Sequence, residues 1–362
     1  MAVALDTAIK FGAGRVRAEQ GLIAQLGEEM ARFGKKMFIV AGPRSWDAVK
    51  EQLEPCMKAA GVEWELEIYT GWCCYEGAEE LAAKAHAAGC DEIVGVGGGK
   101  IMDFAKAVGE VAKLGTINIP TSASTCAPFT CMSVMYTVEG GKKTSWRFDH
   151  EIDAVYMDYD VIAACPHRYN AAGILDAMAK KIEMLNGRPE MKLDDNPIDV
   201  FTAYNMAAYV YDVLAERGQQ AIEDNRAGVY TKTLGDVAFL NVITTGVIAN
   251  TTKSFRQSEL AHVIYDGVRT HFTHEAADAI HGEIVGVGLF CQLYFNGLKE
   301  AEEELRAYMK AMDLPTTLGE IGIEPTEENI ATIEEYIVNS RHYNSDDPAD
   351  RVRLHEAVLE MV

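Results

Sequence analysis

The chain has 362 residues, of which 48% are apolar and 24% charged, and these ordinary globular values exclude collagen-like, disordered and small disulfide-framework proteins. The formal net charge is −22. A surface this acidic repels nucleic-acid phosphates and anionic lipid, and we therefore expect neither nucleic acid nor a membrane among the partners. There is no run of 18 or more apolar residues and no signal-peptide pattern, and the eight cysteines have no framework spacing. We therefore expect a cytoplasmic protein with reduced thiols.

Short apolar runs alternate with helical patterns in the first part of the chain, which is typical of a parallel sheet covered by helices on both faces. The runs predict strands at 37–41, 67–70, 92–96, 116–119 and 154–157, a helix at 78–88, and a β-hairpin from 132–137 and 144–148.

Beyond residue 166 the pattern becomes helical. Long helix-periodic stretches cover 170–185, 200–216, 234–250 and 282–299, and an acidic helical tail follows. We predict an α/β nucleotide-type domain over 1–165 and an all-helical domain over 166–362.

The strongest local signal is VGVGGGKIMDFAK at 94–106, where a strand ends in three glycines and a helix starts at once. Glycines let the backbone approach a ligand closely, and the free N–H groups of a helix start attract phosphate oxygens. The pattern is not G-x-G-x-x-G, so it does not support an ordinary Rossmann assignment, and a plain tight connection stays an alternative.

A second polar loop, PTSASTCAPFT at 120–130, follows the next strand. Ligands of parallel sheets bind beyond the carboxyl ends of the strands, so we expect the two loops to share a crevice. The alternative is an ordinary solvated Ser/Thr loop.

A candidate metal site consists of Asp176, His262 and His281. One carboxylate oxygen and two imidazoles suit Zn²⁺ and also Fe²⁺, and three protein ligands leave a position open for a substrate. Spacing alone is not specific, because the chain has nine histidines and most histidines in proteins are structural.

Seven segments in collinear order resemble one family: FGAGRV, GGGKIMDFAK, IPTSASTCAPFTCMSVMYT, AGILDAMAKKIE, AHVIYDG, HGE and LPTTLGEIGI. Over nearly its whole length the chain is similar to the iron-containing (group III) alcohol dehydrogenases, in the branch of glycerol and hydroxycarboxylate dehydrogenases. The resemblance implies a dehydroquinate synthase-like fold, with an N-terminal dinucleotide-binding domain, a C-terminal helical domain and a metal and substrate cleft between them. It also implies a homo-oligomer.

The resemblance assigns roles to single residues. Asp176, His262 and His281 match the metal ligands, and Lys180 stands where several iron-dependent relatives have a fourth ligand, which favours zinc over iron. The positions that match cofactor contacts are Gly98, Gly99, Lys100, Asp103, Thr121, Ser124, Thr130, Met132 and Tyr136.

Two departures bear on specificity. Cys126 replaces the Asp with which glycerol dehydrogenases bind a polyol hydroxyl, and a neutral thiol makes a substrate carboxylate less costly to admit. The sequence thus favours a small 2-oxo acid/2-hydroxy acid pair, with glycerol second. Arg44, in place of a ribose-binding Asp, favours NADP(H) over NAD(H).

Several questions stay open at this level. Arg256 or Lys180 could hold a substrate carboxylate, and His274 could relay a proton or lie on the surface. A lyase of the dehydroquinate-synthase-like type, which uses NAD internally, and a non-catalytic binding protein are the alternatives to a dehydrogenase. Leu175, where the family usually has Gly, has no functional explanation in the sequence.

Overall fold

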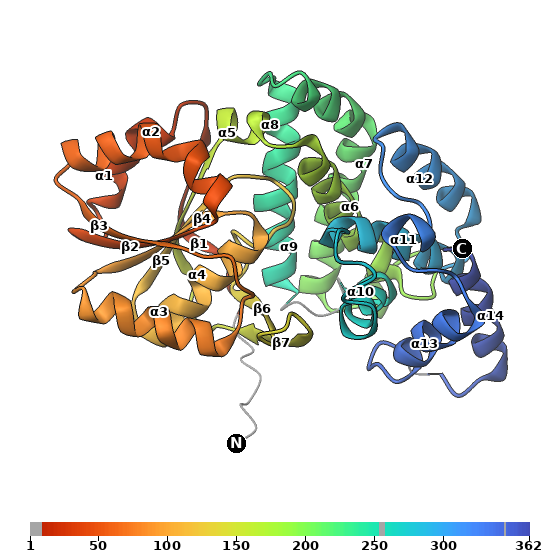
Figure 1. Cartoon of the computed structure of the whole chain (residues 1–362). Coiled ribbons are helices and arrows are strands. Elements are labelled where there is room, and N and C mark those ends of the chain that lie inside the picture. Colours follow the sequence, from red (N-terminus) through yellow and green to blue (C-terminus); the bar gives the residue numbers. More distant parts are fainter. Residues whose placement is uncertain (1–8, 253–257, 344) are drawn as a thin grey trace.

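The computed structural model describes residues 9–252, 258–343 and 345–362. In Figure 1 the first half of the chain, in red to yellow, forms a sheet between helices, and the second half, in green to blue, forms a helical body beside it. The predicted fold class is confirmed. The last strand ends at Asp158, and the domain division at residue 165 stays a prediction.

Six parallel strands form the main sheet in the order β1-β8-β5-β4-β2-β3. Gly97 at the end of β4 pairs with Pro120 at the end of β5, so the loops after these two strands leave the sheet side by side. The strands are β1 (Ala13–Glu19), β2 (Lys36–Ala41), β3 (Glu63–Ile68), β4 (Glu92–Gly97), β5 (Gly115–Pro120) and β8 (Ile152–Asp158).

Helices cover both faces of this sheet (Figure 1). One face carries η1 (Ile23–Gln25), α1 (Leu26–Met30) and α2 (Pro43–Ala59), and the other carries α3 (Tyr75–Ala87) and α4 (Gly99–Ala112). Along β2, Met37 and Ile39 pack toward the first set, while Phe38 and Val40 pack toward the second. A strand buried on both faces needs a continuous apolar run, which explains the segment MFIVA.

A two-stranded antiparallel hairpin, β6 (Met132–Tyr136) and β7 (Lys142–Arg147), stands apart from the main sheet. Ser133 donates a hydrogen bond to the backbone oxygen of Asp103 in α4 at 2.7 Å. The hairpin is thereby fixed against the helix that follows the glycine-rich turn.

The helical half is built around α6 and α11. α11 is apolar around nearly its whole circumference, as a fully buried helix requires. Leu175 of α6 fills the space above Gly286 of α11, which gives this leucine a packing role. The elements are α5 (Tyr159–Ala164), α6 (His167–Leu185), η2 (Leu193–Asp195), α7 (Ile198–Arg226), α8 (Lys232–Phe239), the π-helical turn η3 (Leu240–Thr244), α9 (Thr245–Thr251), α10 (Leu260–His271), α11 (His281–Phe295), α12 (Lys299–Ala311), η4 (Gly319–Ile321), α13 (Glu327–Val338) and α14 (Pro348–Leu359).

One helical stretch, Lys232–Thr251, is long and apolar enough to cross a membrane by length and composition alone. In this fold 72% of its most apolar window is buried inside the protein, as is usual for a core helix.

Most predicted elements agree with the structure, and the differences lie at the edges of the sheet and in the helical half, where the helix predicted over 282–299 ends at Phe295. β1 was not predicted, because this edge strand is half-exposed and carries the charged residues Arg15, Arg17 and Glu19. β3 begins at Glu63 rather than at 67, since EWELEI alternates apolar with charged residues at the other edge of the sheet. α10 was also not predicted, and α7 extends to Arg226 instead of 216.

Candidate active site

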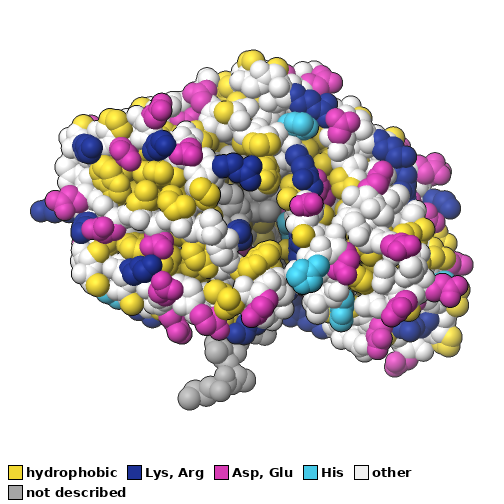
Figure 2. Space-filling model, viewed as in Figure 1, with side chains coloured by type: hydrophobic (Ala, Val, Ile, Leu, Met, Phe, Trp, Pro, Cys, Tyr) yellow, Lys and Arg dark blue, Asp and Glu magenta, His cyan; other side chains and the backbone are white. Residues whose placement is uncertain are grey.

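A cleft of about 990 Å³ lies between the carboxyl ends of β4 and β5 and the helices α6, α10 and α11, and Figure 2 shows the hollow between the two halves. The structure brings the residues predicted to bind the metal, the cofactor and the substrate to this one cleft, together with Lys180. They are Arg44, Gly98, Gly99, Lys100, Asp103, Thr121, Ser124, Cys126, Thr130, Met132, Tyr136, Asp176, Lys180, His262 and His281.

The glycine-rich turn forms the start of α4. Gly98 is the N-cap residue and offers no side chain to cap the helix, while its backbone oxygen accepts hydrogen bonds from the N–H groups of Ile101 and Met102. The first N–H groups of α4 therefore face the cleft without a side-chain acceptor, which is the arrangement that binds phosphate.

The Ser/Thr loop is held in place by a buried lysine that sequence reasoning missed. Lys106 of α4 is 2% exposed, and its ammonium group donates to the backbone oxygens of Ala127 at 2.7 Å and Thr130 at 2.9 Å. It also pairs with Asp103 at 2.9 Å, and Asp103 accepts the N–H of Val134 at 3.0 Å. Asp103 and Thr130 thus bind Lys106, and their contact with a cofactor stays a prediction.

The close approach of α6 to this loop depends on Gly173. A Cβ atom there would lie 1.8 Å from the backbone oxygen of Ala123. Asn241, in the π-helical turn η3, donates to the same oxygen of Ala123 at 3.1 Å and to that of Asn170 at 3.2 Å. The turn therefore places an amide where it joins the Ser/Thr loop to α6.

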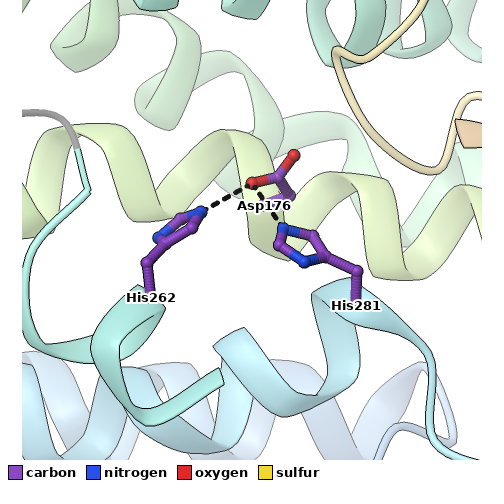
Figure 3. Close-up of side chains that lie close together, drawn as sticks. All are labelled: Asp176, His262 and His281. Atoms are coloured by element: carbon purple, nitrogen blue, oxygen red, sulfur yellow. Dashed lines mark ion pairs between the residues drawn. The ribbon is translucent and has the colours of Figure 1, made fainter. Parts of the chain in front are cut away.

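Three helices bring the predicted metal ligands together, with their side chains pointing toward one another (Figure 3), and all three line the cleft. Asp176 lies on α6, His262 on α10 and His281 at the first position of α11. Asp176 Oδ1 is 3.4 Å from His262 Nε2 and 3.5 Å from His281 Nε2, and the three donor atoms lie within 4.8 Å of one another. Ligands bonded to tetrahedral zinc at about 2.0–2.1 Å are about 3.4 Å apart, so this donor set fits a divalent metal.

Glu183 sets the orientation of His262. This carboxylate is fully buried, accepts the Nδ1 proton of His262 at 2.5 Å, and also accepts the backbone N–H of His262 at 2.9 Å. A proton on Nδ1 leaves the lone pair of Nε2 directed at Asp176, as a metal-ligating histidine requires. Glu183 lies seven positions after Asp176 on α6, and that helical spacing was the available signal.

The position of His281 is fixed by the rest of the HGE motif. Glu283 is 2% exposed, accepts the N–H of Ile280 at 3.0 Å and forms a bidentate pair with Arg168 at 2.5 and 2.6 Å. A Cβ atom on Gly282 would lie 1.9 Å from the backbone oxygen of Ala172. The motif thus combines a predicted metal ligand, a close helix contact and a helix cap.

Charge and burial set the protonation of Asp176 and His281. Burial raises the pKa of Asp176, but Lys180 and the two histidines outweigh it and hold that pKa well below its usual value. Burial lowers the pKa of His281, which keeps its imidazole neutral. Both groups are therefore in the form that binds a metal.

Lys180 lies inside the ligand cluster and is 3% exposed. Its Nζ atom is 2.9 Å from Asp176 Oδ1 and 3.2 Å from His262 Nε2. It lies one helical turn beyond Asp176, so the fourth-ligand position of several relatives carries an ammonium group here.

The hairpin of the first half contacts the helix that carries His262. The hydroxyl groups of Tyr136 on β6 and Tyr265 on α10 are 2.8 Å apart, and Lys142 on β7 pairs with Asp266 on α10. The Tyr265 ring also meets His281 edge-on, with the ring centroids 4.3 Å apart. Tyr136 thus lines the cleft next to the predicted metal ligands, through its contact with Tyr265.

The remaining predicted residues divide between the cleft and the surface. Cys126 is 8% exposed and burial raises its pKa to about 12, so its thiol is neutral. Arg44 is exposed at the rim, in the first turn of α2. His274 is exposed and is not part of the cleft lining within the described chain, whereas Arg256 lies outside the described residues.

All eight cysteines lie in described segments and are free thiols. Cys73 packs against the sulfur of Met135 at 3.5 Å, and the sulfur of Cys74 caps α3 by accepting the N–H of Gly77 at 3.4 Å. The adjacent pair therefore has two different structural roles.

Comparison with known proteins relates the chain to one family of dehydrogenases. The profile of the iron-containing alcohol dehydrogenases matches residues 13–158. The chain is 30% identical over 331 residues to the glycerol dehydrogenase of Thermotoga maritima, covering 89% of this chain and 87% of that protein. It is 27% identical over 338 residues to a glycolaldehyde reductase of Halobacterium salinarum, with 91% and 90% covered.

Two further similarities extend this result. The chain is 28% identical over 312 residues to hydroxycarboxylate dehydrogenase A of Escherichia coli, covering 84% of this chain and 83% of that protein. A solved structure of a probable glycerol dehydrogenase from Sinorhizobium meliloti superimposes with a TM-score of 0.83 at 25% identity, covering 98% of each chain.

Proposed function

The chain belongs to the iron-containing alcohol dehydrogenase family and is an oxidoreductase, and from that premise we propose that it transfers hydride between NAD(P)H and a small 2-oxo acid/2-hydroxy acid pair at a divalent metal. The observation that carries the proposal is the convergence of Asp176, His262 and His281 at one end of a cleft whose opposite wall is a phosphate-type helix start. The expected homo-oligomer and cytoplasmic location remain predictions.

Asp176, His262 and His281 would hold the metal, which when bound supplies a Lewis acid that polarises the substrate oxygen and lowers the pKa of an alcohol. One oxygen and two nitrogen donors with an open position suit zinc and also ferrous iron, and Lys180 in place of the fourth ligand of several iron-dependent relatives supports zinc. Glu183 keeps the proton of His262 on Nδ1, and Arg168 with Glu283 orients the helix start that bears His281. These contacts preorganise the donors before a substrate arrives.

The cofactor would lie across the carboxyl ends of β4 and β5, with its pyrophosphate at Gly98, Gly99 and Lys100 and its nicotinamide toward the metal. Arg44 at the rim supports NADP(H), because a guanidinium can pair with a 2′-phosphate. The cleft walls would bring the nicotinamide and the carbinol carbon into contact and exclude bulk water.

Cys126 supports an acid substrate. Its neutral, buried thiol belongs to the Ser/Thr loop and lines the same cleft as the metal-ligand cluster, and Lys180 offers a positive charge nearby. Hydroxycarboxylate dehydrogenase A is among the relatives. Glycerol is the second candidate, favoured by the glycerol dehydrogenase at 30% identity.

A substrate panel tests the proposal. The protein, reconstituted with zinc or ferrous iron, is assayed for reduction of 2-oxoglutarate and 2-oxobutanoate and for oxidation of glycerol, each with both nicotinamide cofactors. We expect the fastest turnover with a 2-oxo acid and NADPH. Turnover without a net change in nicotinamide absorbance would instead indicate the lyase alternative.

His281→Ala tests the metal centre in the same assay. This variant should fold, lose metal binding and lose turnover. Full activity of His281→Ala after chelator treatment would rule out the assigned ligands.

A further inference from the structure

We propose that Lys180 competes with the metal for His262, so that it weakens metal binding and holds the ligand cluster together when no metal is bound. The inference rests on the proposed metal centre and goes beyond it, because it assigns a function to the lysine that stands at the fourth-ligand position.

The competition follows from where the ammonium group lies. Lys180 Nζ contacts Asp176 Oδ1 at 2.9 Å and His262 Nε2 at 3.2 Å. These are two of the three donor atoms that a metal would use. The lysine is 3% exposed, so its ammonium group is held within the cluster rather than in solvent.

The two donor atoms differ in how many partners they can accept. His262 donates its Nδ1 proton to Glu183 at 2.5 Å, so Nε2 has a single lone pair. An ammonium group can only donate, so it needs that lone pair, and a metal needs the same one. A carboxylate oxygen has two lone pairs, so Asp176 can keep Lys180 while it binds a metal. Metal binding must therefore displace Lys180 from His262 but not from Asp176.

Charge acts in the same direction. Without a metal, Lys180 is the cation that balances the buried carboxylate of Asp176. A divalent cation on the same carboxylate oxygen lies close to the ammonium group, and the two positive charges repel each other in a site of low solvent access. Lys180 thus lowers the affinity for the metal and stabilises the metal-free protein.

The neighbouring residue on α6 provides a matched control. Lys181 has a side chain that is 27% exposed and pairs with Asp212 at 3.4 Å, away from the ligand cluster. Lys181→Met makes the same chemical change as Lys180→Met in the same helix. Lys180→Gln is the second variant, because its amide removes the charge but can still donate to Asp176.

Two measurements on the full-length protein test the proposal without an activity assay. Dissociation constants for zinc and ferrous iron are determined by competition with a chromophoric chelator, and thermal unfolding is followed in the metal-free protein. We expect Lys180→Met and Lys180→Gln to bind metal about 10- to 100-fold more tightly than the wild type. Their metal-free forms should unfold at lower temperature, and Lys181→Met should match the wild type in both measurements.

The outcomes separate this inference from the proposed function. Equal or weaker metal binding by the two Lys180 variants, with measurable binding by the wild type, overturns the competition and leaves the metal centre intact. If neither the wild type nor the variants bind metal, the proposed metal centre is wrong, and the proposed competition fails with it. If Lys180→Met does not fold, Lys180→Gln decides the question.

Discussion

The sheet side and the helical side of the cleft present different chemistry to a ligand. The sheet side offers backbone N–H groups of the α4 start and the hydroxyl groups of the Ser/Thr loop. Each of these two sets of groups comes from a single short segment of the sequence. The helical side offers a carboxylate, two imidazoles and an ammonium group, which come from three helices. The carboxylate and the ammonium group form a buried pair, and the two imidazoles are partly exposed.

This difference has consequences for substitution. A backbone donor survives a change of side chain, whereas each buried charge on the helical side depends on its neighbours. Removing one member of a buried pair leaves the other uncompensated, which costs about 3–5 kcal/mol. We therefore expect larger and less additive effects on the helical side.

The largest effect should come from Asp176→Asn. It removes a proposed metal ligand and leaves Lys180 buried without a counter-charge, so activity should fall by about three orders of magnitude and the unfolding temperature should also fall. The double variant Asp176→Asn/Lys180→Met should regain stability but not activity, as measured by thermal unfolding and steady-state kinetics. An equally unstable double variant would contradict the buried pair.

Glu183→Gln should have the next largest effect. It weakens the hold on the Nδ1 proton of His262, so metal affinity and activity should fall by about 10- to 100-fold. Metal titration and kinetics measure this, and Glu190→Gln, at an exposed glutamate paired with Lys192, is the control. An unchanged metal affinity in Glu183→Gln would separate Glu183 from the ligand cluster.

The opposite end of the sheet offers a buried carboxyl group with no role in the site. Glu92 is 5% exposed, and burial together with Asp153 raises its pKa to about 9. The folded protein thus keeps a proton that the unfolded chain loses near the usual glutamate pKa, so stability falls as the pH rises from there to about 9.

Glu92→Gln should remove this dependence. It should stabilise the protein by about 1–3 kcal/mol at neutral pH and leave activity unchanged. Unfolding temperatures of both proteins between pH 4.5 and 9 measure the effect, and a constant difference across that range would argue against the buried proton.

Arg44→Ser should have the smallest effect, on the sheet side. Loss of the guanidinium should raise the KM for NADPH by about tenfold and leave that for NADH unchanged. Arg32→Ser, at an exposed arginine paired with Glu29, is the control. Equal changes for both cofactors would indicate that Arg44 does not read the 2′-phosphate.

The sequence predicted the sheet side well, because its signals are local. The strand β2 can be predicted from its short apolar run, and the turn before α4 from its three glycines. The edge strands β1 and β3 were missed or shifted, since half-exposed strands carry charged residues that weaken the apolar pattern.

The helical side was predicted only in part. Its three ligands came from the resemblance to a family and not from spacing, because they are brought together by helix packing. The contacts of Glu183 and Lys180 with His262 could not be read from the sequence, since they depend on how α6 and α10 face each other.

The hydroxyl pair of Tyr136 and Tyr265 and the ion pair of Lys142 and Asp266 join the β6–β7 hairpin to α10. These two contacts connect the two halves of the protein beside the cleft. If the two halves move apart to admit or release a dinucleotide, either these contacts break or the halves rotate about them. The same helix carries His262, so such a swing would move a metal ligand together with the hairpin rather than apart from it.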